Sequence, residues 1–305
     1  MDTQKLRNKN GQINIILQDE QSRTVQKDNH GITSHNPFSH IDTEFSAFIG
    51  MNQLKQTIKE IYATIVVNDK RHEMGMTKSR QVLHMLFKGN PGTGKTTVAR
   101  KLAEMYYDMN LLSKGHLIEA ERADLVGEYI GQTAQKTRRI IQKAMGGILF
   151  VDEAYSLARG GEKDFGKEAI DTLVKHMEDY HSDFVLILAG YPKEMERFLT
   201  FNPGLKSRFP FIMDFQDYEI DQLIMIAKQM VQDREYALTK EAVWKLRSHI
   251  NIQKQTTTAN FSNARYIRNI VERSIRHHAV RLLNQEMFSV NDLMFLTEED
   301  LSFDR

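Results

Sequence analysis

Residues 89–96, which read Gly-Asn-Pro-Gly-Thr-Gly-Lys-Thr, constrain the fold more than any other part of the chain. They match in full the pattern G-x-x-x-x-G-K-[ST], which is typical of a loop that wraps a phosphate group. An apolar run precedes the loop at 83–88, and an amphipathic helical pattern begins at Lys95. A strand, a glycine-rich loop and a helix in this order predict an α/β fold with a parallel sheet.

Short apolar runs elsewhere in the chain predict the other strands. The five predicted strands are 83–88, 116–121, 148–152, 184–189 and 211–215. None alternates strictly between apolar and polar residues, which is typical of a parallel sheet covered by helices on both faces. Helical patterns lie between the strands, and one of them follows Gly131 and another covers 165–177.

After about Asp217 the apolar runs of strand type stop, and only helical patterns follow, at 219–233, 239–250 and 261–284. A set of strands and helices followed by helices alone predicts an α/β domain with a small all-α domain attached. We therefore expect a five-stranded parallel sheet flanked by helices and followed by a helical lid.

The chain divides into three predicted parts. Residues 1–40 are rich in Asn, Gln, His and Asp, and such a segment buries too little apolar area to offset the entropy of ordering. We expect a flexible polar tail there. Residues 41–217 are assigned to the α/β domain, and 218–305 to the helical lid domain with a C-terminal tail.

Composition excludes several classes of protein. The 41 Lys and Arg residues balance 40 Asp and Glu residues, which argues against a general polyanion binder. The chain has no cysteine, so disulfides, thiolate metal sites and cysteine nucleophiles are excluded. No apolar run is long enough for membrane insertion, and the first residues lack the apolar block of a secretory signal. We expect a cytoplasmic protein.

The glycine-rich loop predicts binding of ATP with Mg²⁺. Its glycines allow backbone amides to point at phosphate oxygens, and the following helix N-terminus adds positive potential. Lys95 is expected to reach the β- and γ-phosphates, and the Thr96 hydroxyl to ligate Mg²⁺. The predicted cofactor-binding residues of the loop are Gly89, Asn90, Pro91, Gly92, Thr93, Gly94, Lys95, Thr96 and Thr97.

Two adjacent acids, Asp152 and Glu153, end the predicted strand at 148–152. The carboxyl ends of parallel strands open onto the ligand crevice, so both acids are expected beside the phosphate loop. Asp152 is suited to hold the hydration shell of Mg²⁺, and Glu153 to polarise a water towards the γ-phosphate. Such a pair could instead cap the next helix, but together with the loop it favours ATP hydrolysis over a phosphotransferase. The guanine signature N-K-x-D is absent, which favours ATP over GTP.

With both motifs considered, residues 45–285 resemble the AAA+ ATPases. Within that superfamily the sequence is most similar to the branch that contains stage V sporulation protein K and the red-type Rubisco activases, and it looks closest to the former. The resemblance is carried by segments 83–103, 122–138, 146–166 and 202–210. It implies a homo-hexameric ring with ATP sites between subunits, in which hydrolysis remodels another macromolecule.

The resemblance also implies nucleotide contacts outside the two motifs. Ile49 and Gly50 match the segment that packs on the adenine, although a turn in the core before the next helix is an equal alternative. Arg208 matches the arginine finger, which stabilises transition-state charge on the neighbouring subunit's γ-phosphate. Arg265 matches the sensor arginine of the lid, and Arg268, one turn away, is its rival.

A further resemblance predicts contacts to a client. Tyr129, Ile130 and Gly131 match the aromatic–hydrophobic–glycine pore loop, which grips a polypeptide by area and stacking. The alternative is a tyrosine that covers the edge of the sheet. Residues 157–163 occupy the place of a second pore loop, or form a solvated connector.

The sequence departs from the family pattern after the fourth strand. Many AAA+ proteins have Asn or Thr there, whereas this chain reads Ala189-Gly190-Tyr191, and the Tyr191 hydroxyl is the candidate replacement.

The helical segment 261–284 is rich in arginine, which fits a lid beside a triphosphate better than a nucleic-acid surface. The pair His277-His278 points to adjacent sides of a helix, so Mg²⁺ is the only metal expected.

The sequence is compatible with three classes of function, the first of which has two versions. The favoured function is an ATP-driven ring that remodels an unidentified protein client through a central pore, with a role in spore maturation. A red-type Rubisco activase is the alternative within the same branch. An ATP-gated scaffold that does not thread its client, and a nucleic-acid loader that uses the basic lid helix, are the other two.

Overall fold

The computed structural model describes residues 37–46, 48–77, 81–160, 164–256, 261–285 and 287–303. The predicted tail at 1–40 therefore lies mostly outside the described residues, although a short helix, α1, already begins at Ser39. Within the described residues, no helix combines the length and the apolar character needed to cross a membrane.

The α/β domain contains a five-stranded sheet in which every pair of neighbouring strands is parallel. Its strands are β1 (Met85–Gly89), β2 (Leu117–Ala120), β3 (Ile148–Val151), β4 (Val185–Gly190) and β5 (Phe211–Phe215). The order across the sheet is β2-β3-β4-β1-β5, so the strand before the phosphate loop lies between β4 and β5. The predicted parallel sheet is confirmed.

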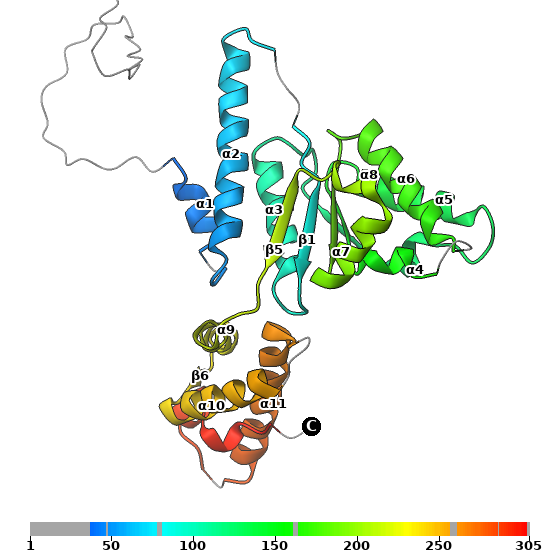
Figure 1. The fold of residues 1–305 in the computed structure, drawn as a ribbon. Helices are drawn as coiled ribbons and strands as arrows, with labels where there is room; N and C mark the ends of the chain where they lie inside the picture. Colours follow the sequence, from blue (N-terminus) through cyan, green and yellow to red (C-terminus); the bar gives the residue numbers. More distant parts are fainter. Residues whose placement is uncertain are drawn as a thin grey trace, which may run out of the picture. The chain divides into compact units, whose positions relative to one another are not determined.

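Helices cover both faces of this sheet (Figure 1). They are α1 (Ser39–Glu44), α2 (Asn52–Glu73), α3 (Lys95–Asp108), α4 (Arg122–Leu125), α5 (Gln132–Ala144), α6 (Gly166–Asp179), α7 (Pro192–Phe201) and α8 (Pro203–Lys206), with a 3₁₀ turn, η1, at Ala154–Ala158. Strand β1 shows how the two cores arise. Its Met85 and Phe87 belong to the apolar cluster that includes residues of α2 and α3, whereas Leu86 belongs to the cluster that includes residues of α5, α6 and α7, because successive strand residues point to opposite faces.

Strand β1 begins two residues after the predicted start at Leu83. Leu83 and His84 are buried, and the His84 side chain, instead of the backbone, joins this segment to β4. The backbone amide of Leu186 donates to His84 Nδ1 at 3.0 Å, and His84 Nε2 lies 3.1 Å from the carbonyl oxygen of Met177. Burial lowers the pKa of His84 to about 4.

The helical lid follows β5. It contains α9 (Ile220–Gln232), α10 (Lys240–Thr256), α11 (Asn263–Leu283) and α12 (Val290–Met294), with a short 3₁₀ turn, η3, at Glu298–Asp300. A third apolar cluster holds α9, α10 and α11 together. The expectation that strands stop after Asp217 is wrong in one detail, because β6 (Ala237–Leu238) pairs in parallel with β7 (Phe295–Leu296). Two residues are too few to produce a strand pattern in the sequence.

Candidate nucleotide-binding site

The phosphate loop connects β1 to α3, and its backbone requires glycine at two positions. Gly92 and Gly94 have φ values of 69° and 94°, in the left-handed region that residues with a Cβ rarely adopt. The next residue, Lys95, is buried, and its Nζ donates to the carbonyl oxygens of Gly89 at 2.8 Å and Asn90 at 2.9 Å. Burial lowers the pKa of Lys95, while the carboxylate of Asp152 acts in the opposite direction.

A cavity of about 230 Å³ lies over this loop. It is lined by Pro91, Gly92, Gly94, Lys95, Thr96, Thr97, Asp152, Glu153, Gly190, Tyr191, Ala264, Arg265 and Arg268. The fold therefore brings together the glycine-rich loop, the two acids after β3, the end of β4 and the start of α11. These elements are far apart in the sequence.

Three predicted loop residues do not line the cavity. Gly89 is buried at the end of β1, where a Cβ would lie 2.6 Å from that of Phe215. The Asn90 side chain turns towards Asp217 and donates to both of its carboxylate oxygens. The Thr93 hydroxyl donates to the Asn90 carbonyl at 2.8 Å, which stabilises the turn of the loop.

Asp152 and Glu153 follow β3 at the edge of the cavity. The amide of Glu153 donates to Asp152 Oδ1 at 2.9 Å, which fixes one carboxylate oxygen. Glu153 itself has a φ of 45°, a left-handed conformation that is costly for a residue other than glycine. Strain of this kind persists where the surrounding structure determines the conformation, and it is concentrated at functional sites.

Two tyrosines flank the Glu153 carboxylate. The rings of Tyr155 and Tyr191 lie 5.7 Å apart between centroids. Burial raises the pKa of both hydroxyls, and the negative charge of Glu153 raises it further. Both hydroxyls therefore remain protonated at neutral pH. Tyr191 lines the cavity, and its role as the replacement for the usual polar residue after β4 stays a prediction.

A second cavity, of about 540 Å³, adjoins the loop at Gly94 and Thr97. Ile49, which the resemblance assigns to the contact with adenine, lines it together with lid residues such as Ile226 and Met230. Gly50 lies in the turn before α2 with a φ of 73°. A Cβ at Gly50 would lie only 2.2 Å from the Gln222 side chain, so the turn also needs glycine for space.

Arg265 and Arg268 both belong to α11, and both line the first cavity. Arg268 also lines the second one. The structure thus places the predicted sensor arginine and its rival at the same site. Another arginine of this helix, Arg281, is paired with Asp300 inside the lid at 2.8 Å. Two arginines of α11 thus line the cavity and a third is paired inside the lid, whereas Arg276 is exposed.

Arg208 does not reach the cavity of its own chain. Its Nε donates to Oε1 of Glu178 at 2.5 Å, and its Nη1 donates to the carbonyl oxygen of Gly204. The guanidinium is thus held at the end of α6 by two contacts. An arginine at this position contributes to hydrolysis only if it faces another molecule.

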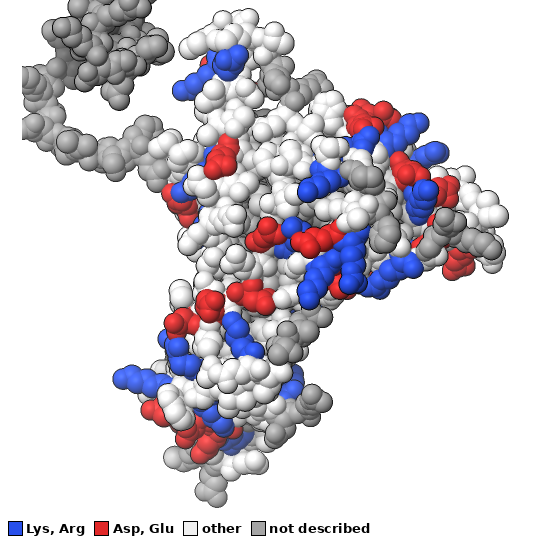
Figure 2. All heavy atoms as spheres, viewed as in Figure 1, with Lys and Arg blue, Asp and Glu red and all other residues white. Residues whose placement is uncertain are grey.

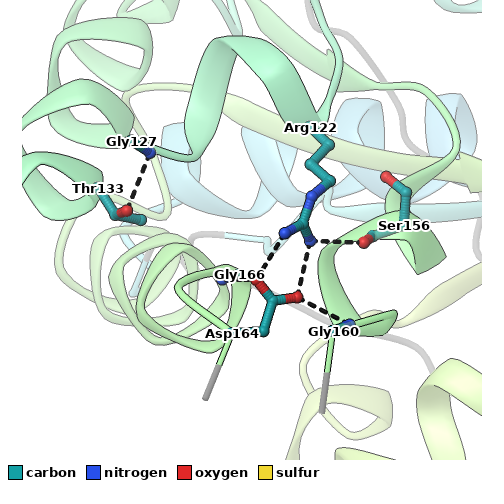
Figure 3. A network of polar contacts seen from close by, with 7 residues as sticks. All are labelled: Arg122, Gly127, Thr133, Ser156, Gly160, Asp164 and Gly166. Atoms are coloured by element: carbon teal, nitrogen blue, oxygen red, sulfur yellow. Dashed lines mark hydrogen bonds and ion pairs between the residues drawn. The ribbon is translucent and has the colours of Figure 1, made fainter. Parts of the chain in front are cut away.

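The predicted pore loop is exposed. Tyr129 and Ile130 have 67% and 89% of their surface accessible, so two adjacent large apolar side chains face outward. Gly131 adopts a φ of 82° in open space. At the base of this loop the amide of Gly127 donates to the Thr133 hydroxyl at 3.0 Å, as Figure 3 shows.

An ion pair lies close to this loop and was not expected from the sequence. The Arg122 guanidinium donates to both carboxylate oxygens of Asp164, at 2.9 and 2.5 Å, and to the carbonyl oxygen of Ser156 (Figure 3). Asp164 also accepts the amides of Gly160 and Gly166, and the neighbouring guanidinium lowers the pKa of its carboxyl. The network ties α4 to residues on either side of 161–163.

The predicted second pore loop at 157–163 is described only in part, since 161–163 lie outside the described residues. Leu157 is buried and belongs to η1. The loop therefore begins later than expected. The face drawn in Figure 2 carries Lys and Arg side chains beside Asp and Glu side chains.

The sequence match extends over both domains. Residues 85–217 match the family model described as "ATPase family associated with various cellular activities (AAA)", and residues 219–305 match the model of the AAA lid domain. The chain belongs to the AAA ATPases, as the fold and the cavity also indicate.

Two curated relatives are particularly informative. The chain is 57% identical to stage V sporulation protein K of Bacillus subtilis (strain 168), over 96% of this chain and 94% of that protein. It is 43% identical to the chloroplastic ribulose bisphosphate carboxylase/oxygenase activase of Cyanidioschyzon merolae, over 83% and 87%. Among solved structures, the FIGL-1 AAA domain in complex with ADP aligns with a TM-score of 0.56 and 17% identity, over 84% of this chain and 81% of that one, which shows the fold.

Proposed function

We propose that this chain hydrolyses ATP to ADP and phosphate in a Mg²⁺-dependent reaction, and that it does so as a ring. The observation that carries the proposal is the cavity in which Lys95, Asp152, Glu153 and Arg265 meet. A buried lysine on a glycine-rich loop supplies positive charge for phosphates. Two acids at the end of a strand supply a metal-binding carboxylate and a base for water.

Each residue then has a separate role. Lys95 binds the β- and γ-phosphates, and Arg265 contacts phosphate from the lid. Glu153 orients and polarises the attacking water, with the Tyr191 hydroxyl as a neighbouring hydrogen-bond donor. Because Tyr191 stays protonated, it can donate throughout the neutral pH range.

The residues present fit a Mg²⁺ ion. Thr96 and Asp152 both line the cavity and offer hydroxyl and carboxylate oxygens, which are the ligands that Mg²⁺ prefers in nucleotide sites. When bound, Mg²⁺ neutralises charge that develops on the phosphates. Asp152 already uses one oxygen to accept the Glu153 amide, and this contact fixes the direction of its carboxylate.

Arg208 supports assembly, because it is held away from the cavity of its own chain. In the proposed homo-hexamer it acts in trans, as an arginine finger for the neighbouring subunit. AAA ATPases typically form oligomers, which favours this arrangement. Hydrolysis is then expected to require contact between subunits.

The client is proposed to be a protein that is gripped by the loop at Tyr129, Ile130 and Gly131. Exposed aromatic and aliphatic side chains can bind a polypeptide without sequence readout. The similarity to stage V sporulation protein K favours a cytoplasmic role in spore maturation. A Rubisco-activase-like action is the second candidate. It is supported by the identity of 43% to the chloroplastic activase, which is lower than the identity of 57% to stage V sporulation protein K.

Two other candidates receive less support. The scaffold hypothesis would use ATP only to change shape, but Glu153 and Tyr191 at the cavity favour hydrolysis. The nucleic-acid hypothesis relied on the basic lid helix, of which two arginines, Arg265 and Arg268, line the cavity. Charge reversal at Arg273 and Arg276, which do not line it, tests that hypothesis: salt-dependent DNA affinity that is lost in the reversed protein would support it.

The experiment that tests the proposal is the native mass of the Glu153→Gln protein with and without ATP. This change leaves the binding groups in place and blocks hydrolysis, so any ATP-dependent assembly is trapped. We expect a shift from small species to six subunits. The matched control is Lys95→Ala, which should show no shift with ATP. A Glu153→Gln protein that binds ATP and remains monomeric at every concentration would contradict the ring.

A further inference from the structure

A series of hydrogen bonds joins the phosphate loop to the lid at a place that does not line either cavity. Asn90 Nδ2 donates to both oxygens of Asp217, at 3.0 and 2.9 Å. Asn263 Nδ2 donates to Oδ1 of the same carboxylate at 2.7 Å. Asp217 is therefore shared between the loop that wraps phosphate and the first residue of α11.

Asn263 is built into this junction. It is fully buried, and its φ of 43° lies in the left-handed region. Its Oδ1 accepts the amide of Tyr218 at 3.0 Å, and its Nδ2 also donates to the carbonyl oxygen of Phe261 at 2.9 Å. A buried polar side chain with partners on both sides fixes the local backbone, and this offsets the cost of the left-handed conformation.

The backbones of the loop and the lid are also in direct contact. The amide of Ala264 donates to the carbonyl oxygen of Gly92 at 3.1 Å, and the Tyr218 hydroxyl donates to that of Thr93 at 3.2 Å. A Cβ at Gly92 would lie 2.3 Å from the Ser262 carbonyl oxygen. The two elements therefore cannot shift relative to each other without breaking these contacts.

We propose that Asp217 and Asn263 are positioning residues that hold α11, and with it Arg265, over the phosphate loop. This inference rests on the proposed function, since it takes the cavity to be a nucleotide site. A helix moves as a rigid unit, so a change at its first residue displaces Arg265 two residues later. Because Asn90 donates to Asp217, a movement of the phosphate loop displaces the Asp217 carboxylate as well. Nucleotide binding and lid position are thereby coupled.

The first test measures the affinity for a fluorescent ADP analogue in Asp217→Ala and Asn263→Gly proteins. Glycine accepts the left-handed backbone, so the second variant removes only the side chain. We expect each variant to bind about tenfold more weakly, which corresponds to one charge-assisted hydrogen bond. In the double variant the loss of binding free energy should be smaller than the sum of the two single losses, because both changes break the contact between Asp217 and Asn263. Asp221→Ala is the matched control, since Asp221 pairs with Arg247 within the lid.

The second test follows the lid itself. The chain has no cysteine, so spin labels can be placed at Arg197→Cys on α7 and Glu241→Cys on α10 without other changes. ADP should narrow the distance distribution in the otherwise unchanged protein, and should leave it broad in Asp217→Ala. The proposal would be overturned by unchanged ADP affinity in Asp217→Ala and Asn263→Gly, or by an Asp217→Ala protein in which ADP narrows the distance distribution as much as in the otherwise unchanged protein. A protein with native Asp217 and Asn263 that binds no ADP would instead contradict the nucleotide site itself.

Discussion

The Nε atom of Arg208 lies 2.5 Å from Oε1 of Glu178, so the arginine is held by an acid of its own chain. Its Nη1 also donates to the carbonyl oxygen of Gly204. Together these contacts restrict the guanidinium before any partner arrives. A donor that is already oriented needs less reorganisation when it meets developing charge.

We predict that Arg208→Ala lowers kcat for ATP by about 10³-fold, because a finger contributes at this scale. The affinity for nucleotide should change little, since Arg208 does not line the cavity of its own chain. Steady-state ATP hydrolysis is the measurement, and Arg197→Ala, an exposed arginine of α7, is the control. Mixing Arg208→Ala with Lys95→Ala protein should restore part of the rate, because some sites then contain both residues. Two inactive proteins that stay inactive after subunit exchange would contradict action in trans.

A second prediction concerns Tyr129. Its side chain is 67% exposed, so Tyr129→Ala should leave the melting temperature and the basal ATP hydrolysis unchanged. We expect it to abolish stimulation of hydrolysis by an unfolded polypeptide such as casein, because the aromatic side chain that contacts the polypeptide is lost. Tyr107→Ala, which removes an exposed tyrosine of α3, is the matched control. Full stimulation of the Tyr129→Ala protein would exclude the pore mechanism.

The Tyr191 hydroxyl gives a third prediction. Tyr191→Phe should lower kcat about tenfold while KM for ATP stays the same, since the hydroxyl acts beside Glu153 during hydrolysis. Because the pKa of Tyr191 is raised above its ordinary value of 10, ionisation of this hydroxyl should cause no loss of rate between pH 6 and pH 8. Rates over this range test both statements. A Tyr191→Phe protein with an unchanged kcat would show that another group positions the water.

His84 predicts how stability depends on pH. Its pKa in the folded protein is about 4, below its ordinary value of 6.5. Between these values the unfolded chain binds a proton that the folded chain does not, so the free energy of unfolding falls as the pH decreases. The loss attributable to His84 should reach about 3 kcal/mol at pH 4. Urea unfolding at several pH values measures it, and His84→Gln should show a smaller decrease over the same range.

The sequence predicted those parts of the fold that local patterns encode. Residues 89–96 and the acids at 152–153 each stand in a continuous segment with a strand beside it, so both were identified directly. The position of β1 between β4 and β5 was not predicted, because strand order depends on contacts between distant segments. The late start of β1 has a local cause, since His84 joins β4 through its ring.

The polar contacts that complete the site could not be predicted for a related reason. Arg122 and Asp164 are 42 residues apart, and nothing in either segment indicates the other. Asn263 resembles an ordinary residue at a helix start, and only the fold shows that it meets Asp217. Single polar residues carry little pattern, so their pairing appears only once the chain is folded.

The close contact between Gly92 and the start of α11 bears on where this protein can be divided. A chain that ended at Asp217 would retain all five strands, the glycine-rich loop and both acids. It would nevertheless leave the carbonyl oxygens of Gly92 and Thr93 without the donors that the lid supplies. The shortest piece that binds nucleotide as the intact protein does should therefore extend through α11. The two matched family models meet between residues 217 and 219. This border therefore divides a site to which both domains contribute residues.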